Sequence, residues 1–231
     1  MIQDKELGNI TFELSLKAKR MRAMILPDGI RVVLPKGFSE KDGIKFVESV
    51  RGKIRQRQAK IQHKSIVITE EKPLKTLTFA VEVYKTERKD IFSSLKSGVL
   101  TIQYPDFLVC EEQKTQEYFW KSINYFLRKE AKRLLPYRTY ELAQQFGFRY
   151  ADVKIQSSKT RWGSCNRKKN INLSFYLLLL PQYLIDYVIL HELCHTREMN
   201  HSDKFWKEMD SVTNSKSKVL RRELKNYSMP R

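Results

Sequence analysis

The first part of the chain alternates apolar and polar positions in short segments, and this period of two is typical of half-buried β-strands. Segments of this kind span residues 11–16, 24–34, 66–68, 77–84 and 98–104. The second segment contains Pro27, Asp28 and Gly29, which predict the turn of a hairpin. The pattern therefore predicts a β-rich N-terminal region.

Residues 39–62 interrupt these strands with apolar residues at helical spacing, and Ser39 followed by Asp42 predicts an N-terminal cap. The predicted buried stripe contains Ile44, Val47, Val50 and Ile54. The opposite face is basic and contains Arg51, Lys53, Arg55, Arg57 and Lys60. Such a face can contact phosphates, but a solvated helix surface is the interpretation we favour.

A long helical pattern follows over residues 113–146, and Pro136 predicts a break within it. Its aromatic residues recur at helical spacings, so we assign them to a core rather than to a stacking surface for bases: Tyr118, Phe119, Trp120, Tyr125 and Phe126. Strands return at residues 152–156 and 170–175. No internal repeat is evident. Pro105 and Asp106 mark the expected boundary between a β-rich region with one helix (residues 1–105) and a second domain (residues 106–231).

The helix predicted after Pro181 is apolar on most sides, which is typical of a helix buried in a core. Near its end it contains His191, Glu192 and His195. Two histidines four positions apart lie one helical turn from each other, close enough to bind one zinc ion. Bare burial of such polar groups is unfavourable, so they need polar or metal partners. The alternative is a surface helix in which this pattern arose by chance.

His201 supplies a third nitrogen ligand if the chain turns back after His195. Three protein ligands leave one position for water, which is typical of a catalytic zinc ion rather than a structural one. Glu192 beside the first ligand then has the position of a general base acting on the zinc-bound water. The alternative for His201 is a solvated histidine in a turn.

The turn itself is expected at Asn200, an asparagine that tolerates the left-handed conformation. Ser202 is expected to cap a new helix over residues 203–210. The sequence does not select the group that stabilises an oxyanion, although Arg197 or a tyrosine would serve. It also leaves open which carboxylates orient the histidines, and the neighbours in sequence are Asp203, Glu208 and Asp210.

Three blocks of sequence together resemble the YgjP-like metallopeptidase family, a relative of the SprT-like and WLM-type zinc proteases. The blocks span residues 161–165, 187–195 and 200–206. The resemblance implies an α+β fold in which the β-rich part precedes a zincin-like catalytic part with a central HExxH helix and a small mixed sheet. It also implies a zinc-dependent peptidase that hydrolyses peptide bonds and binds one Zn2+ per chain, with His191, His195 and His201 as ligands and Glu192 as the catalytic residue.

Peptidases of this broad type bind an extended peptide along an exposed sheet edge. The expected edge strand lies just before the histidine-containing helix and consists of Asn170, Ile171, Asn172, Leu173 and Ser174. The block from Arg161 to Cys165 is expected to form the turn between two strands, with Gly163 at a tight bend.

Composition adds a strong positive charge, because 44 lysines and arginines outnumber 26 aspartates and glutamates to give +18. This charge favours acidic partners and suggests non-specific binding of nucleic acid. Two alternatives to a general peptidase follow. One is a DNA-associated protease that acts on DNA-bound or crosslinked proteins. The other is a non-catalytic basic module that binds nucleic acid and holds a structural zinc ion or none.

Three widely spaced cysteines (Cys110, Cys165 and Cys194) indicate a reducing compartment. The N-terminus lacks the pattern of a signal peptide, and the longest apolar run is shorter than the roughly 20 residues that span a bilayer. We therefore expect a cytoplasmic protein that does not associate with membranes. The sequence does not indicate its oligomeric state.

Overall fold

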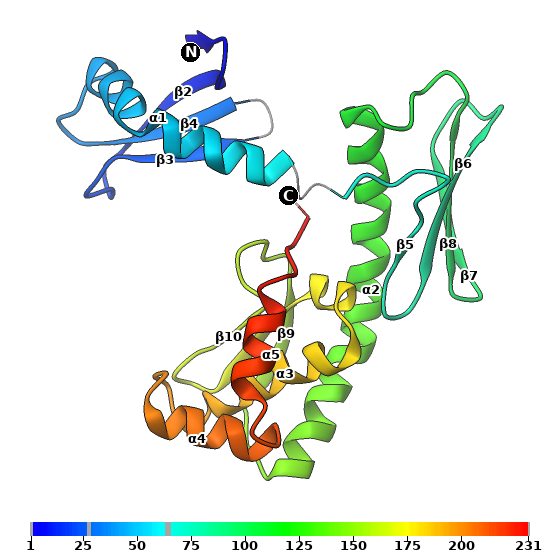
Figure 1. The fold of residues 1–231 in the computed structure, drawn as a ribbon. Helices are drawn as coiled ribbons and strands as arrows, with labels where there is room; N and C mark the ends of the chain where they lie inside the picture. Colours follow the sequence, from blue (N-terminus) through cyan, green and yellow to red (C-terminus); the bar gives the residue numbers. More distant parts are fainter. Residues whose placement is uncertain (1, 27–28, 63–65, 231) are drawn as a thin grey trace. The chain divides into compact units, whose positions relative to one another are not determined.

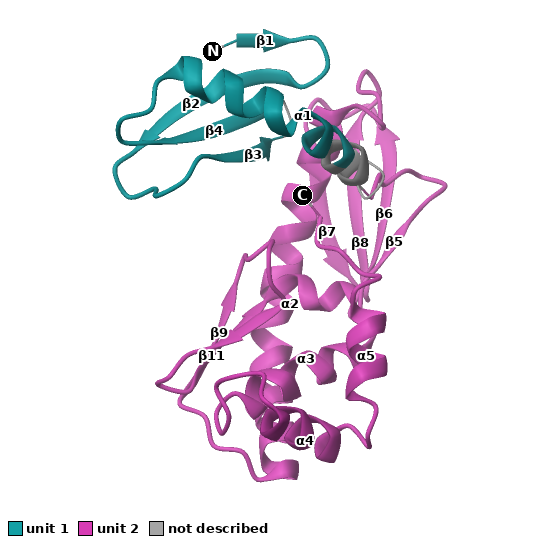
Figure 2. Cartoon of the chain, turned by 60° about the vertical axis from the view of Figure 1, so that its left-hand side comes forward, with its two compact units in different colours: residues 1–65 teal, residues 66–231 magenta. Residues whose placement is uncertain are grey.

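The structure is a computed structural model that describes residues 2–26, 29–62 and 66–230, with the side chains of residues 57–62 left aside. Its contacts divide the chain into two compact units, residues 1–65 and residues 66–231 (Figure 2). Helices and mixed sheets together make an α+β fold (Figure 1).

Unit 1 consists of a four-stranded sheet and one helix. Its elements are β1 (Ile2–Asp4), β2 (Gly8–Ser15), β3 (Arg22–Leu26), β4 (Gly29–Pro35) and α1 (Glu40–Gln62). The predicted cap is confirmed: the Ser39 backbone N–H donates to Asp42 Oδ2 at 2.9 Å, and the Asp42 N–H donates to Ser39 Oγ at 3.3 Å. The hairpin turn predicted at Pro27 and Asp28 lies outside the described residues.

The buried stripe of α1 differs in part from its prediction. Val47 and Ile54 are buried, whereas Ile44 is exposed. Gly43 lies against the sheet instead, because a Cβ atom there would stand 2.7 Å from Phe12 Cε1. A glycine shows no apolar signal in a sequence pattern, so the contact was not predicted.

Ion pairs occupy part of the basic face of α1. Arg51 donates to Asp4 Oδ2 at 2.7 Å and also pairs with Glu48. The hydrogen bonds from Arg51 hold the pKa of Asp4 far below its usual range. Arg55 pairs with Glu6 at 3.4 Å, and Lys53 is exposed. The side chains of Arg57 and Lys60, the last two members of this predicted face, lie outside the described residues.

Unit 2 contains two sheets and four α-helices among its described residues. Its elements are β5 (Leu74–Lys75), β6 (Ala80–Thr86), β7 (Phe92–Lys96), β8 (Val99–Pro105), α2 (Gln113–Phe146), β9 (Asp152–Gln156), β10 (Gly163–Cys165), β11 (Asn170–Ser174), the 3-10 helix η1 (Phe175–Leu179), α3 (Gln182–Cys194), α4 (Asp203–Val212) and α5 (Ser217–Leu224). Residues 66–68 form no strand, contrary to prediction.

The four-stranded sheets of the two units repeat one topology. Their strand orders are β1-β2-β4-β3 and β5-β6-β8-β7, and corresponding pairs are parallel or antiparallel alike. In each sheet the hairpin pairs five residues with five, and every residue of β3 and β4 corresponds to one 70 positions later, as Arg22 does to Phe92. A helix follows each sheet in the chain (Figure 1).

This repeat is not evident in the sequence, because the two sheets share the spacing and pairing of their strands but few identical residues. Pro35 and Pro105 occupy matching positions at the end of the parallel ladder. The buried positions of β4 and β8 match in spacing but differ in residue, as Leu34 and Tyr104 illustrate. Alternating burial requires apolar side chains at every second position without specifying which.

Helix α2 is continuous from Gln113 to Phe146, so the break predicted at Pro136 is wrong. The residues on either side of the proline, Leu135 and Thr139, are buried, and this packing compensates for the roughly 3 kcal/mol that a proline costs within a helix. Phe119 on α2 packs edge-on against Tyr104 of β8 with ring centroids 5.2 Å apart. The expected domain boundary at residue 105 therefore falls inside the core of unit 2, and the contacts instead separate the units at residue 65.

The aromatic residues of α2 only partly form the predicted core. Phe119 is buried, and Trp120 and Phe126 are half-buried. Tyr118 and Tyr125 are 53% and 64% exposed, so the core prediction is wrong for these two. The three cysteines are free, and none of the described helices is both long and apolar enough to cross a membrane.

Gln116 is a buried side chain of α2 that fixes the segment entering unit 2. It accepts a hydrogen bond from the Ile68 N–H at 2.9 Å and donates to the carbonyl oxygens of Ile68 and Cys110, both at 2.8 Å. Substitution Gln116→Met leaves buried backbone groups without partners, so we expect the free energy of unfolding to fall by about 2–4 kcal/mol. Chemical denaturation measures this, and the exposed Gln113→Met is the matched control. Equal stability of the two variants would contradict the prediction.

Candidate metal centre

Helix α3 carries the candidate site through the core of unit 2. It begins after Pro181, whose extended backbone precedes the first turn, and its C-cap is His195. Leu184 and Val188 are buried on the stripe that continues to His191 and His195, as predicted. Polar groups thus project from the part of the helix that is buried among apolar side chains.

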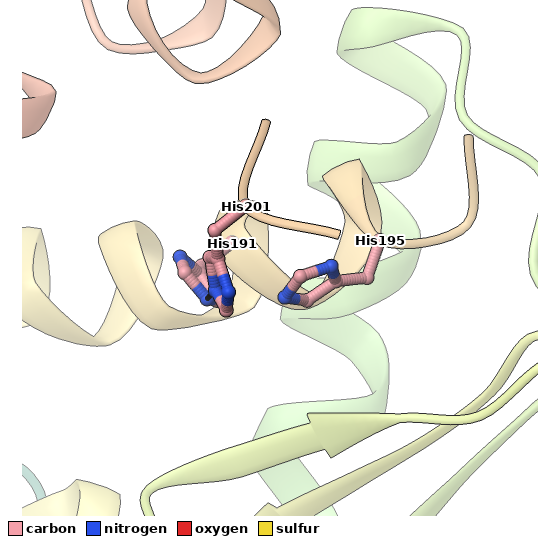
Figure 3. Close-up of side chains that lie close together, drawn as sticks. All are labelled: His191, His195 and His201. Carbon is pink, nitrogen blue, oxygen red and sulfur yellow. Dashed lines mark hydrogen bonds between the residues drawn. The ribbon is translucent and has the colours of Figure 1, made fainter. Parts of the chain in front are cut away.

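The structure brings His191, His195 and His201 together, and their ligand atoms all lie within 4.8 Å of one another. The rings converge on one side of α3, with His201 arriving from the turn that follows the helix (Figure 3). The Nε2 atoms of His191 and His201 are 3.0 Å apart. Two nitrogens bound to one tetrahedral zinc ion lie roughly 3.3 Å apart, so small shifts would fit this set to a metal ion.

Aromatic packing holds the three rings in place. Phe205, fully buried on α4, has its ring centroid 4.9 Å from His191, 4.5 Å from His195 and 4.8 Å from His201. Its ring is stacked on His195 at an interplanar angle of 27°. One phenylalanine therefore contacts every candidate ligand.

Hydrogen bonds to the other ring nitrogens are few. His195 Nδ1 lies 3.0 Å from the carbonyl oxygen of Glu198, a contact that assigns the proton to Nδ1 and leaves Nε2 free for a metal ion. His191 Nδ1 is buried and has no hydrogen-bond partner among the described residues. A backbone carbonyl thus takes the orienting role that the sequence analysis sought among carboxylates.

The three carboxylates considered earlier act elsewhere. Glu208 pairs with Arg197, and Asp210 accepts a hydrogen bond from Ser217 at 2.5 Å. Asp203 lies in the first turn of α4, which Ser202 caps as predicted. Asn200 is not among the described residues with positive φ, so the predicted left-handed turn is wrong.

Electrostatics favour neutral imidazoles at this site. Burial, followed by the proximity of His195 and His201, lowers the pKa of His191 to about 3. Burial also lowers the pKa of His195. A neutral imidazole is the form that binds a metal ion, so the lowered pKa values of His191 and His195 favour their role as zinc ligands. Imidazole ligands also suit other divalent metal ions.

Glu192 is buried beside the histidines and packs directly against Gly163 of β10. A Cβ atom at position 163 would lie 2.7 Å from Glu192 Oε1, so any larger residue there would displace the carboxylate. Burial raises the pKa of Glu192 to about 8, and the positive charge of Arg161 opposes that rise. The tight bend expected at Gly163 is replaced by a strand, and the need for glycine comes from this carboxylate.

A pocket of about 250 Å³ opens over these groups. Its lining consists of Gly163, Ser164, Cys165, His191, Glu192, His195, Met199 and His201. One wall is thus the strand β10, and the opposite wall carries the histidines. Cys165 is a poor nucleophile here, because burial and the nearby Glu192 raise the pKa of its thiol to about 11.

The prediction that residues 170–174 form an exposed edge is wrong. Strand β11 is the middle strand, paired antiparallel with β10 and parallel with β9. The side chains of Ile171, Leu173 and Ser174 are buried, and Asn172 accepts a hydrogen bond from Gln156 at 2.7 Å. Asn170 pairs in register with Asp152 of β9. The backbone of β11 is therefore hydrogen-bonded to a neighbouring strand on both sides.

The edge beside the pocket is β10, which the sequence analysis had interpreted as a turn. Only three residues long, it has no apolar alternation that could have revealed it. Arg197, one of the groups considered for stabilising an oxyanion, is engaged elsewhere. Its guanidinium donates to the carbonyl of Gly147 at 2.6 Å and lies 4.2 Å from the ring centroid of Phe148, beyond the end of α2.

Comparison with known families decides the assignment. Residues 19–227 match the YgjP-like, metallopeptidase domain family. The chain belongs to the YgjP-like metallopeptidase family. It has no significant match among curated proteins.

Solved structures similar to this YgjP-like chain include two metallopeptidase zymogens. That of Pyrococcus abyssi abylysin is 23% identical with a TM-score of 0.35, and the match covers 38% of this chain and 90% of that one. That of Methanocaldococcus jannaschii jannalysin is 22% identical with a TM-score of 0.33, and the match covers 38% of this chain and 92% of that one.

Zinc should stabilise the protein through His201, the most exposed of the three histidines. At a zinc concentration about 100 times the Kd, we expect the melting temperature of the chelator-treated protein to rise by roughly 5–10 °C. The variant His201→Ala should melt like wild type without metal but show little of this rise. The chain's fourth histidine, His63, lies outside the described residues, and His63→Ala is the control. An unchanged zinc response in His201→Ala would exclude His201 as a ligand.

Proposed function

We propose that this protein is a zinc-dependent peptidase in which His191, His195 and His201 bind one zinc ion and Glu192 is the general base. The observation that carries the proposal is the convergence of three histidine nitrogens beside a buried carboxylate in one open pocket. Membership of a metallopeptidase family supports the reaction class. Neutral, preoriented imidazoles support the choice of ligands.

In this proposal Glu192 moves the protons. A zinc ion in this site supplies Lewis acidity toward water and toward a peptide carbonyl. The Glu192 carboxylate accepts a proton from a water molecule in the pocket and delivers it to the nitrogen of the leaving amine. Burial raises the pKa of this carboxylate to about 8, which makes it a stronger base than an exposed glutamate. The positive charge of a bound ion would favour its ionised form.

The substrate is proposed to bind as an extended peptide along β10. The outer edge of this strand is unpaired within the three-stranded sheet, and its residues line the pocket beside Glu192. Backbone groups of Gly163, Ser164 and Cys165 would then pair with the peptide, as in other cases of β-augmentation. Backbone pairing does not depend on the side chains of the peptide. Selectivity for particular peptide sequences would therefore come from other residues that line the pocket, such as Met199.

Three further expectations stay predictions from composition. These are the cytoplasmic location, the absence of membrane association and the binding of nucleic acid, which rests on the net charge of +18. A peptidase that acts on DNA-bound proteins is compatible with that charge.

Removal of the carboxylate charge should separate catalysis from metal binding. We expect Glu192→Gln to lower kcat/KM for peptide cleavage by at least about 100-fold, because the amide cannot accept the proton. Zinc content and melting temperature of the metal-loaded protein should not fall. Cleavage of a fluorogenic peptide library measures the rate, and Glu117→Gln on the exposed face of α2 is the control. Wild-type cleavage by Glu192→Gln would remove this residue from the mechanism.

Gly163→Ala tests whether the position of Glu192 matters beyond its charge. The added methyl group would stand 2.7 Å from Oε1 and must displace the carboxylate. We expect roughly 10–100-fold slower cleavage, since a displacement of about 1 Å can have an effect of this size. Zinc affinity should stay within about threefold of wild type, because the histidines are not displaced. Disturbing the metal site itself typically lowers affinity roughly tenfold or more. Gly52→Ala in α1 adds a methyl group where no atom lies within 4 Å and serves as control.

A further inference from the structure

His201 differs from the other two histidines in how it is held. His191 and His195 project from α3, whereas His201 lies in the turn before α4, between the exposed residues Asn200 and Ser202. An exposed side chain in a turn loses conformational freedom when it binds a metal ion, and that loss weakens binding unless the side chain is held in advance.

Trp206 supplies that restraint. Its ring is stacked beside His201 at an interplanar angle of 27°, with centroids 6.0 Å apart. Phe205 contacts the same imidazole edge-on at 4.8 Å. The imidazole of His201 is therefore confined by two neighbouring rings from the first turns of α4.

The indole is itself fixed from both sides. It is half-buried against the core of unit 2, and the guanidinium of Arg221 on α5 lies 4.9 Å from its ring centroid. Helix α5 packs against both α3 and α4. A continuous series of contacts thus runs from α5 through Arg221 and Trp206 to His201.

We propose that Trp206 is a positioning residue that holds His201 in its metal-binding orientation, and that Arg221 secures the indole. This inference rests on the proposed function, since it requires the three histidines to bind zinc. Arg221 has two opposed effects. It restrains Trp206, but its positive charge repels a cation and contributes to the lowered pKa of His191. Trp206 carries no charge, so its replacement tests the restraint alone.

The test compares zinc affinities measured by competition with a chromophoric chelator. We expect Trp206→Leu to bind zinc about 10-fold more weakly than wild type, at the lower end of the loss seen when a group orienting a metal ligand is removed. Trp206→Phe keeps an aromatic ring and should recover most of the affinity. Trp120→Leu removes another half-buried tryptophan, distant in sequence on α2, and should leave zinc affinity unchanged whatever its effect on stability.

A double variant distinguishes positioning from general loss of structure. In the background of His201→Ala, Trp206→Leu should weaken zinc binding no further, because the imidazole that it positions is absent. The absorption spectrum of the cobalt-substituted protein should change in Trp206→Leu as it does in His201→Ala. Equal additional weakening in both backgrounds would overturn the positioning role.

Arg221→Gln provides a second variant on the surface, where folding is not at risk. The measurement is made in about 1 M salt, where charges are screened beyond about 3 Å, so that loss of the charge repulsion does not mask loss of the restraint. Under these conditions we expect Arg221→Gln to bind zinc roughly 2–5-fold more weakly than Arg222→Gln. Wild-type affinity in both Trp206→Leu and Arg221→Gln would overturn the inference and leave the metal site intact. Absence of stoichiometric zinc binding in the wild-type protein would instead overturn the proposed function.

Discussion

The burial of polar side chains on α3 is the constraint on which the rest of this structure depends. His191, Glu192 and His195 project from a helix whose apolar residues, from Leu184 to Cys194, belong to the core of unit 2. Burying such groups without partners is unfavourable. In this structure His195 Nδ1 contacts a backbone carbonyl, His201 joins the other two histidines, and Glu192 lines an open pocket. A metal ion bound among the three histidines would supply a partner for the nitrogens that converge there.

The surrounding elements position these groups by packing more than by hydrogen bonding. Phe205 contacts all three imidazoles, and Trp206 lies against the one that is most exposed. On the opposite wall, Gly163 allows β10 to approach the Glu192 carboxylate closely. The same short strand leaves an unpaired edge beside the pocket. The proposed general base and the proposed peptide-binding edge are thus brought together because position 163 has no side chain.

Unit 2 also shows how a repeated sheet-and-helix module is joined to the part of the chain that holds the candidate metal centre. The sheet formed by β5 to β8 repeats the topology of unit 1, yet its following helix, α2, is longer and continues into the core around α3. Tyr104 and Phe119 join that sheet to the first half of α2, and Leu142 and Ala143 belong to the same core at its far end. One continuous core therefore includes residues on both sides of the boundary that was expected at Pro105 and Asp106.

The sequence by itself determined the candidate chemistry and most elements. The spacing of His191 and His195 depends only on the helical period, and Ser202 caps α4 through a local hydrogen bond, so both were predictable. Tertiary structure alone decided which strand is the edge, why position 163 is glycine, and that Phe205 and Trp206 hold the histidine rings. The strand pairing and the contact of Gly163 with Glu192 join residues distant in the chain, and the aromatic contacts depend on how α4 packs back onto α3. A pattern along one segment does not specify its neighbours in space. The repeated topology was not predicted for a related reason: the two sheets pair their strands in the same way with different side chains.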